Sequence, residues 1–227
     1  LLSKQGLDAV SSLATRTAIE MRDFGFNLNL GVMVNTHSFY SYTSDADWAV
    51  RIGETITKRY AANRVFTAYQ YFPGGGDYTV PGMKIDASKA SLMDDDGRVF
   101  AQLIDATRDE HPMIMVNAVK VTSIDADHPV SLSKTIITDW LRKELGFDGV
   151  VITDDIEVGA AVASMSIEDY AVRTINAGSD MVIVCKHPKH IKDVHDALTQ
   201  AVADETISEA RLDEAVRRIM LMKFSNE

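Results

Sequence analysis

The chain has 227 residues, of which 46% are hydrophobic, and this is enough to bury one substantial core. Its net charge of −10, without any dense cluster of Lys and Arg, excludes nucleic acid and anionic membrane surfaces as partners. Since no apolar run approaches the ~20 residues of a membrane span, we expect a soluble protein, either cytoplasmic or exported.

The first part of the chain alternates patterns typical of helices with patterns typical of strands. Apolar residues recur at helical spacing over residues 4–24, and a two-residue period over 26–34 predicts a strand that ends at Asn35. A second helix is predicted over residues 45–61, and a second strand over 65–71.

A glycine-rich loop, FPGGGD at residues 72–77, continues neither kind of element. A phosphate-binding loop would open directly into a helix, whereas residues 78–82 include Pro81 and Gly82 and are not expected to form one. We therefore expect an irregular loop here and no phosphate site.

The same alternation continues to the end of the chain. The predicted elements are a helix over 94–110, a strand over 113–119, a loop over 121–130, a helix from Ser133 to Gly146, a strand over 150–152, a helix from Ser166 to Gly178, a strand over 181–185, and helices over 190–202 and 208–223. The last helix is expected to bury a face made of Leu212, Ala215, Val216, Ile219 and Met220. Cys185, the lone cysteine, is predicted to be a small core residue of a buried strand, not a nucleophile.

This order of elements predicts a parallel sheet covered by helices, either a (β/α)8 TIM-barrel-like fold or an open doubly wound sheet. We expect residues 1–227 to form one α/β domain. A complete barrel takes ~250 residues and eight strands, so we expect either a barrel that is incomplete at its N-terminus or a smaller sheet. Open sheet edges need cover, which predicts a homo-oligomer.

Two carboxylates, Asp154 and Asp155, follow the short apolar run Val150–Ile152. In α/β proteins such a strand delivers its last side chains to a cleft at the carboxyl edge of the sheet. Carboxylates at that position can take part in catalysis, bind a divalent ion such as Mg²⁺, or cap the next helix. The pattern alone leaves these three roles open.

Several segments occur together and in a fixed order. They are LRKELGFDGVVITDDIEVGA at 141–160, HPVSLS at 128–133, NAGSDMVIV at 176–184, ISEARLDEAVRRIMLMK at 207–223, and the earlier FNLNLGVMVN and FPGGGD. As a set they resemble the family 3 glycoside hydrolases, in particular the single-domain β-N-acetylglucosaminidase branch. The resemblance implies a TIM barrel and retaining hydrolysis of O-glycosyl bonds, with Asp154 as the nucleophile. It also implies a glycan containing N-acetylglucosamine as the ligand, with no cofactor and no metal.

Other positions of the family's site carry different residues here. The family's lysine–histidine pair aligns with Gln70 and Tyr71, and its sugar-binding aspartate aligns with Asn35. The histidine that serves as the family's acid/base aligns with Gly75, while Asp77 keeps the last position of that loop. Besides Asp154, the resemblance therefore implies that Asn35, Gln70, Tyr71 and Asp77 bind the substrate.

Three functional interpretations follow. The first is a retaining β-N-acetylhexosaminidase that uses Asp154 and has weak activity, because general acid/base assistance contributes ~10²–10⁴ in rate. The second is a catalytically degenerate pseudoenzyme that binds a glycan or a protein partner. The third is a Mg²⁺-dependent α/β hydrolase or lyase in which Asp154 and Asp155 hold the ion.

Overall fold

The computed structural model describes residues 4–76 and 82–225, which fall into two compact units. The first unit comprises residues 4–76, 90–115 and 222–225, and the second comprises residues 82–89 and 116–221. The single domain over residues 1–227 and the homo-oligomer both stay predictions.

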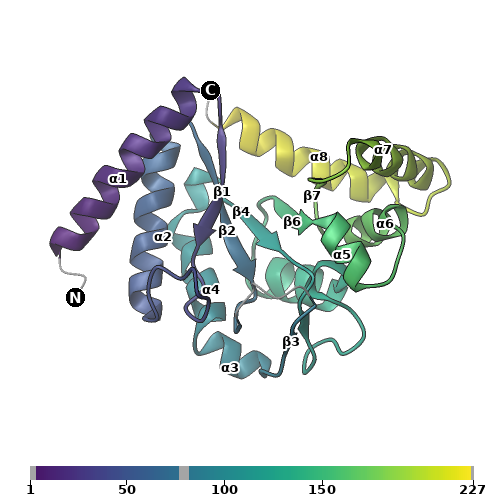
Figure 1. The fold of residues 1–227 in the computed structure, drawn as a ribbon, viewed down its shortest axis with the longest axis horizontal. Coiled ribbons are helices and arrows are strands. Elements are labelled where there is room, and N and C mark those ends of the chain that lie inside the picture. Colours follow the sequence, from purple (N-terminus) through teal and green to yellow (C-terminus); the bar gives the residue numbers. More distant parts are fainter. Residues whose placement is uncertain (1–3, 77–81, 226–227) are drawn as a thin grey trace. The chain divides into compact units, whose positions relative to one another are not determined.

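The first unit combines a sheet with long helices (Figure 1). In chain order its elements are α1 (Lys4–Asp23), β1 (Leu28–Met33), α2 (Ala46–Ala61), β2 (Phe66–Phe72), α3 (Lys89–Met93), α4 (Asp96–Ala106), the 3-10 helix η1 (Arg108–Glu110) and β4 (Met113–Val116). The strands are ordered β1-β2-β4, and β1 runs parallel to β2. Helices α1 and α2 lie side by side.

Helical spacing of small and apolar residues explains how α1 meets α2. Ala14 and Ala18, four residues apart on α1, pack with Tyr60 of α2 and with Val65 in a buried cluster. Helix α2 begins where expected, because the Asp45 side chain accepts the Trp48 N–H at 3.1 Å. The first two predicted helices and strands are thus confirmed to within two residues.

The helix predicted over 94–110 is interrupted. Thr107 leaves the helical conformation with φ −128°, so α4 ends at Ala106 and a short 3-10 helix follows. The buried Thr107 hydroxyl donates to the Leu103 carbonyl at 2.6 Å and lies 2.9 Å from the Tyr69 hydroxyl. A polar contact to a neighbouring strand, invisible in the apolar pattern, therefore sets this helix end.

The second unit also alternates strands and helices. Its elements are β3 (Lys84–Ile85), β5 (Lys120–Val121), the 3-10 helix η2 (Val130–Leu132), the π-type helix η3 (Thr135–Glu144), β6 (Val151–Asp155), α5 (Ile156–Val162), α6 (Ile167–Ala177), β7 (Met181–Ile183), α7 (Pro188–Ala203) and most of α8 (Glu209–Phe224). Strands β6 and β7 are parallel, as are β3 and β5 in a small separate sheet. Parallel strands with intervening helices confirm the predicted α/β class.

Several predicted helix ends in this unit are confirmed. The Ser133 hydroxyl accepts the Ile136 N–H at 3.2 Å, and Ser166 accepts the Asp169 N–H at 3.1 Å. Helix α6 closes at Gly178, whose φ of +125° suits a residue without a Cβ.

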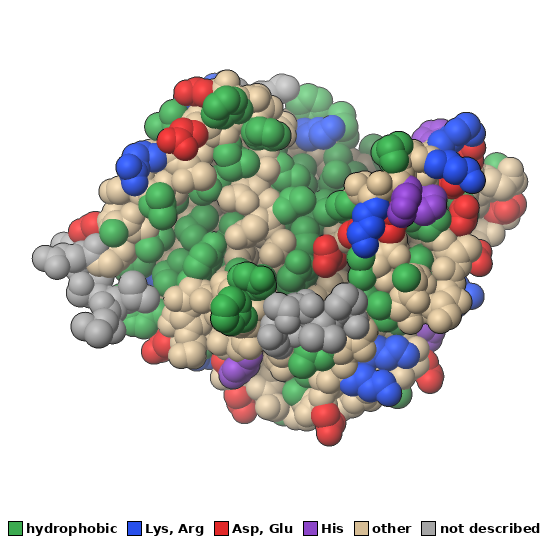
Figure 2. Space-filling view, viewed as in Figure 1, with side chains coloured by type: hydrophobic (Ala, Val, Ile, Leu, Met, Phe, Trp, Pro, Cys, Tyr) green, Lys and Arg blue, Asp and Glu red, His purple; other side chains and the backbone are tan. Residues whose placement is uncertain are grey.

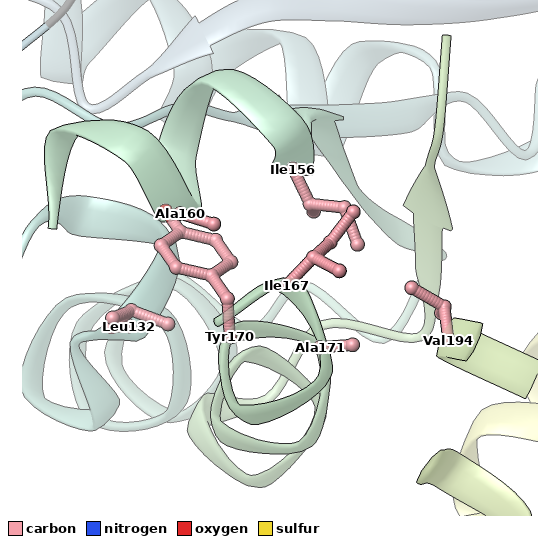
Figure 3. Packing of buried hydrophobic residues seen from close by; sticks show 7 residues of the cluster. All are labelled: Leu132, Ile156, Ala160, Ile167, Tyr170, Ala171 and Val194. Atoms are coloured by element: carbon pink, nitrogen blue, oxygen red, sulfur yellow. The ribbon is translucent and has the colours of Figure 1, made fainter. Parts of the chain in front are cut away.

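A buried cluster joins α5, α6 and α7 (Figure 3). Its members are Leu132, Ile156, Ala160, Ile167, Tyr170, Ala171 and Val194. The Tyr170 ring lies close to the backbone of α5, because a Cβ added at Gly159 would meet Tyr170 Cζ and Oη at 2.5 Å each. Glycine at position 159 thus provides the space for the tyrosine ring.

Gly159→Ala is expected to lower the free energy of unfolding by ~1–3 kcal/mol through this overlap. The sign of this change distinguishes the overlap from a propensity effect, because Gly→Ala inside a helix ordinarily stabilises by ~1 kcal/mol. Urea unfolding measures the change. In a Tyr170→Leu background the penalty should shrink, and an equal penalty in both backgrounds would contradict this explanation.

Two predictions about burial are wrong. Cys185 is exposed beyond the end of β7. Residual desolvation and the nearby Asp155 charge raise the pKa of its thiol. The face predicted for α8 is buried only in part: Ala215 is buried and Ile219 is half-buried, but Leu212, Val216 and Met220 are exposed, whereas Arg218 is buried. The strand predicted over 113–119 also ends early, at Val116.

No helix within residues 4–76 and 82–225 combines the length and apolar character needed to cross a bilayer.

Candidate active site

The two carboxylates at the end of strand β6, Asp154 and Asp155, lie in different surroundings. Val151, Ile152 and Thr153 are buried, Asp154 is exposed at the carboxyl end, and Asp155 is half-buried. The Asp155 carboxylate accepts the Glu157 N–H at 3.0 Å and caps α5, which is one of the three roles that the sequence left open for this pair. Asp154 Oδ1 accepts the Asp155 N–H at 2.8 Å, which fixes the orientation of the exposed carboxylate.

Asp154 borders a small hollow inside the second unit. Asn117, Ser131, Thr153 and Tyr170 also line this hollow, whose volume of about 10 Å³ holds no more than one water. The Tyr170 hydroxyl lies 2.5 Å from Ser131 Oγ. Burial raises the pKa of Tyr170 to about 12, with a smaller contribution from the Asp154 charge, so the phenol keeps its proton at neutral pH.

Tyr170 was missed by the sequence interpretation, which used only the apolar spacing of its helix. The signal in the sequence is weak, because a buried tyrosine at a helical core position differs from phenylalanine by one hydroxyl. Only the fold shows that the ring lies beneath the end of β6, where that hydroxyl is a protonated donor near Asp154.

The first unit brings together the predicted binding residues at the ends of β1 and β2. Asn35 Nδ2 donates to the Tyr71 carbonyl at 3.1 Å, and the Tyr71 N–H donates to Asn35 Oδ1. Asn35 is only 1% exposed, so its amide holds the backbone of Tyr71. Gln70 and Tyr71 are half-buried, and Gln70 Nε2 lies 3.4 Å from Met115 Sδ. Asp77 lies outside the described residues.

Asp96 is a second residue that the sequence interpretation missed. Its buried carboxylate accepts the Thr36 N–H at 2.7 Å, the Thr36 hydroxyl at 2.8 Å and the Gly75 N–H at 2.7 Å. Gly74 passes so close that an added Cβ would lie 2.0 Å from Asp96 Cβ, and its φ is +93°. Asp96 therefore fastens the glycine-rich loop to the end of β1.

Asn35→Asp is expected to lower the free energy of unfolding by ~1–3 kcal/mol, because a carboxylate cannot donate to the partly buried Tyr71 carbonyl. Denaturant unfolding measures this loss. Asn29→Asp is the matched control, since Asn29 uses only its Oδ1, as an acceptor from the Gly31 N–H at 2.8 Å, and a carboxylate can replace it. Equal losses in the two variants would contradict the role of the amide donor.

Comparisons with known proteins agree on one family. The model described as the glycosyl hydrolase family 3 N terminal domain matches residues 1–222. Beta-hexosaminidase A of Pseudoalteromonas piscicida is 24% identical over 249 residues, covering 97% of this chain. The chain spans 41% of the length of that protein.

Solved structures show the same relationship at the level of the fold. A glycoside hydrolase family 3 beta-N-acetylglucosaminidase from Paenibacillus superposes with a TM-score of 0.87 at 25% identity, covering 97% of this chain and 44% of that one. The beta-N-acetylglucosaminidase from Thermotoga maritima gives a TM-score of 0.87 at 24% identity, with coverages of 99% and 51%.

These similarities confirm the resemblance and the TIM-barrel-like α/β fold. They lend no support to the pseudoenzyme interpretation. Because the family model extends over nearly the whole chain, with the glycosidase segments in order, the chain belongs to glycosyl hydrolase family 3 and corresponds to its N-terminal domain.

Proposed function

We propose that the chain carries the chemistry of a retaining β-N-acetylhexosaminidase, with Asp154 as the nucleophile. The observation that carries the proposal is the exposed Asp154 carboxylate at the carboxyl end of β6, held by the Asp155 N–H at 2.8 Å. Catalytic residues of barrel enzymes lie at this edge of the sheet. The relatives named beta-hexosaminidase and the solved structures named beta-N-acetylglucosaminidase support a glycan containing N-acetylglucosamine as the substrate.

The reaction takes place in two displacements. In the first, an Asp154 oxygen forms a bond to the anomeric carbon while the bond to the leaving oxygen breaks and that oxygen takes up a proton from solvent. In the second, water attacks the same carbon and loses its proton to solvent, the Asp154 oxygen leaves as part of the carboxylate, and the anomeric configuration is retained. Since Asp155 is occupied in capping α5, only one of the two adjacent acids serves as nucleophile.

Substrate binding is assigned to Gln70, Tyr71 and Asp77, with Asn35 acting through the backbone of Tyr71 that it holds. The leaving oxygen requires a proton, and Gly75 has no side chain to supply one. The expected rate is therefore below that of an enzyme with a complete acid/base pair, by up to ~10⁴. No metal or cofactor takes part.

Covalent trapping tests this proposal. A 5-fluoro-N-acetylglucosaminyl fluoride has an activated leaving group, which forms the glycosyl-enzyme without acid assistance, and its fluorinated ring slows the hydrolysis step. Mass spectrometry after trypsin digestion is expected to find the added sugar on the peptide of residues 144–173, which contains Asp154. An adduct on a different peptide, or none after prolonged incubation, would reject Asp154 as nucleophile.

A further inference from the structure

Three metal-ligating side chains from different parts of the second unit meet at its surface. They are Glu157 in the first turn of α5, His187 directly before α7, and His190 in the first turn of α7. We infer that Glu157, His187 and His190 form a binding site for a divalent metal ion of the zinc class. Figure 2 shows histidine side chains at the surface on the side of the view where Figure 1 places α7.

The distances fit this assignment. Glu157 Oε1 lies 2.6 Å from Nδ1 of His187 and 2.6 Å from Nδ1 of His190, and the candidate ligand atoms all lie within 4.8 Å of one another. Zinc bonds of ~2.0–2.2 Å in tetrahedral geometry place neighbouring ligand atoms ~3.3 Å apart. Each imidazole nitrogen would thus move away from Glu157 Oε1 by less than ~1 Å. The ion would then replace the proton that each hydrogen bond now shares.

Glu157 is fixed before any ion arrives. Its other carboxylate oxygen accepts the Lys186 N–H, and its side chain is only 6% exposed. Such a contact to a ligating carboxylate is the kind of outer support that orients metal ligands in proteins. His187 is 65% exposed and His190 is 34% exposed, so an ion can enter from solvent and keep a water ligand.

The donor set selects the class of metal. Two imidazole nitrogens and one carboxylate oxygen suit zinc and its neighbours in the first transition row. Magnesium and calcium prefer oxygen ligands and are expected to bind much more weakly. His187 is the extended residue directly before α7 and His190 lies in the first turn, and both imidazoles contact the same Glu157 oxygen.

A bound ion would tie the start of α5 to the loop between β7 and α7. Helix α5 begins immediately after Asp154 and Asp155, so the ion would restrain the segment that continues from the exposed carboxylate. This role is structural and separate from the two displacements proposed for Asp154.

Titration of the untagged, metal-free chain with ZnCl₂, followed by calorimetry, tests the site. We expect one ion per chain, and at least ~100-fold weaker binding in His187→Ala/His190→Ala. His195→Ala is the matched control, because His195 is also exposed on α7 but its imidazole pairs with the neighbouring Asp196 and not with Glu157, and the zinc affinity of this variant should equal that of the wild type. Excess MgCl₂ should not compete.

Glu157→Gln provides a second variant of nearly unchanged shape, and it should also lose zinc affinity. Co²⁺ gives an independent signal, since three protein ligands and water produce the strong visible absorption of a tetrahedral site. The inference is overturned if the wild type binds no zinc, if the His195→Ala and double variants lose affinity equally, or if magnesium displaces the ion. If the double variant does not fold, the wild-type stoichiometry and the Glu157→Gln result decide.

Discussion

Asp154→Asn is expected to lower kcat/KM for an aryl β-N-acetylglucosaminide at least ~10³-fold, since the amide cannot form the glycosyl-enzyme. An aryl leaving group needs little protonation, so the assay reports the nucleophile even where acid assistance is weak. The substitution removes a charge at an exposed position and should leave the fold intact. Initial rates for purified wild type and variant, at equal folded fraction by circular dichroism, give the comparison.

Asp139→Asn is the matched control for this experiment. Asp139 is an acid of η3 whose side chain is about half exposed and pairs with Lys143 at 2.7 Å, so its loss should change kcat/KM less than ~2-fold. A sharper test is Asp154→Gly with sodium azide, where azide should restore turnover and yield the glycosyl azide of inverted configuration. Equal activity of wild type and Asp154→Asn would exclude the proposed role.

The largest stability effect is expected at Asp180. Its side chain is fully buried and contacts Arg142 at 2.6 Å, Arg211 at 2.9 Å and Arg218 at 3.3 Å, while also accepting the Val151 N–H at 3.0 Å. Asp180→Ala would leave these guanidinium groups without their shared carboxylate. We expect a loss of ~3–5 kcal/mol in the free energy of unfolding, measured by urea denaturation.

Asp148→Asn tests whether burial of the acid, and not its charge alone, determines how much an ion pair of this network contributes to stability. Asp148 contacts Arg217 at 2.7 Å and Arg218 at 2.9 Å, yet its side chain is 61% exposed. Solvent screens such a pair, so its loss should cost less than ~1 kcal/mol. A result in which both substitutions cost the same would show that the buried position of Asp180 does not determine its contribution.

The regular elements could be predicted because their apolar spacing and end signals agree. Val150–Ile152 followed by acids marks β6, and Ser133, Ser166 and Gly178 mark helix ends that the structure confirms. Asp154 could be singled out for the same reason, since a buried strand leading to a carboxylate leaves a local trace in the sequence. Its catalytic role stays a prediction.

Residues whose positions depend on partners far away in the sequence could not be predicted from the local pattern. Apolar spacing on α8 predicted Leu212 and Met220 as buried, but Arg218 faces inward because it pairs with Asp180, 38 positions away in the sequence. The same applies to Asp96, which looks like an ordinary first-turn acid until Thr36 and Gly75 are seen donating to it. In each case a tertiary hydrogen bond or ion pair outweighs the local pattern.

The bonds of Asp96 also have a mechanical consequence. Thr36 follows β1 and Gly75 follows β2, so two loops that are remote in the chain share one anchor. If one loop moves, its hydrogen bonds to Asp96 must either strain the other loop or break. The two loops therefore move as one rigid unit, and a sugar that contacts either loop would sense the position of both.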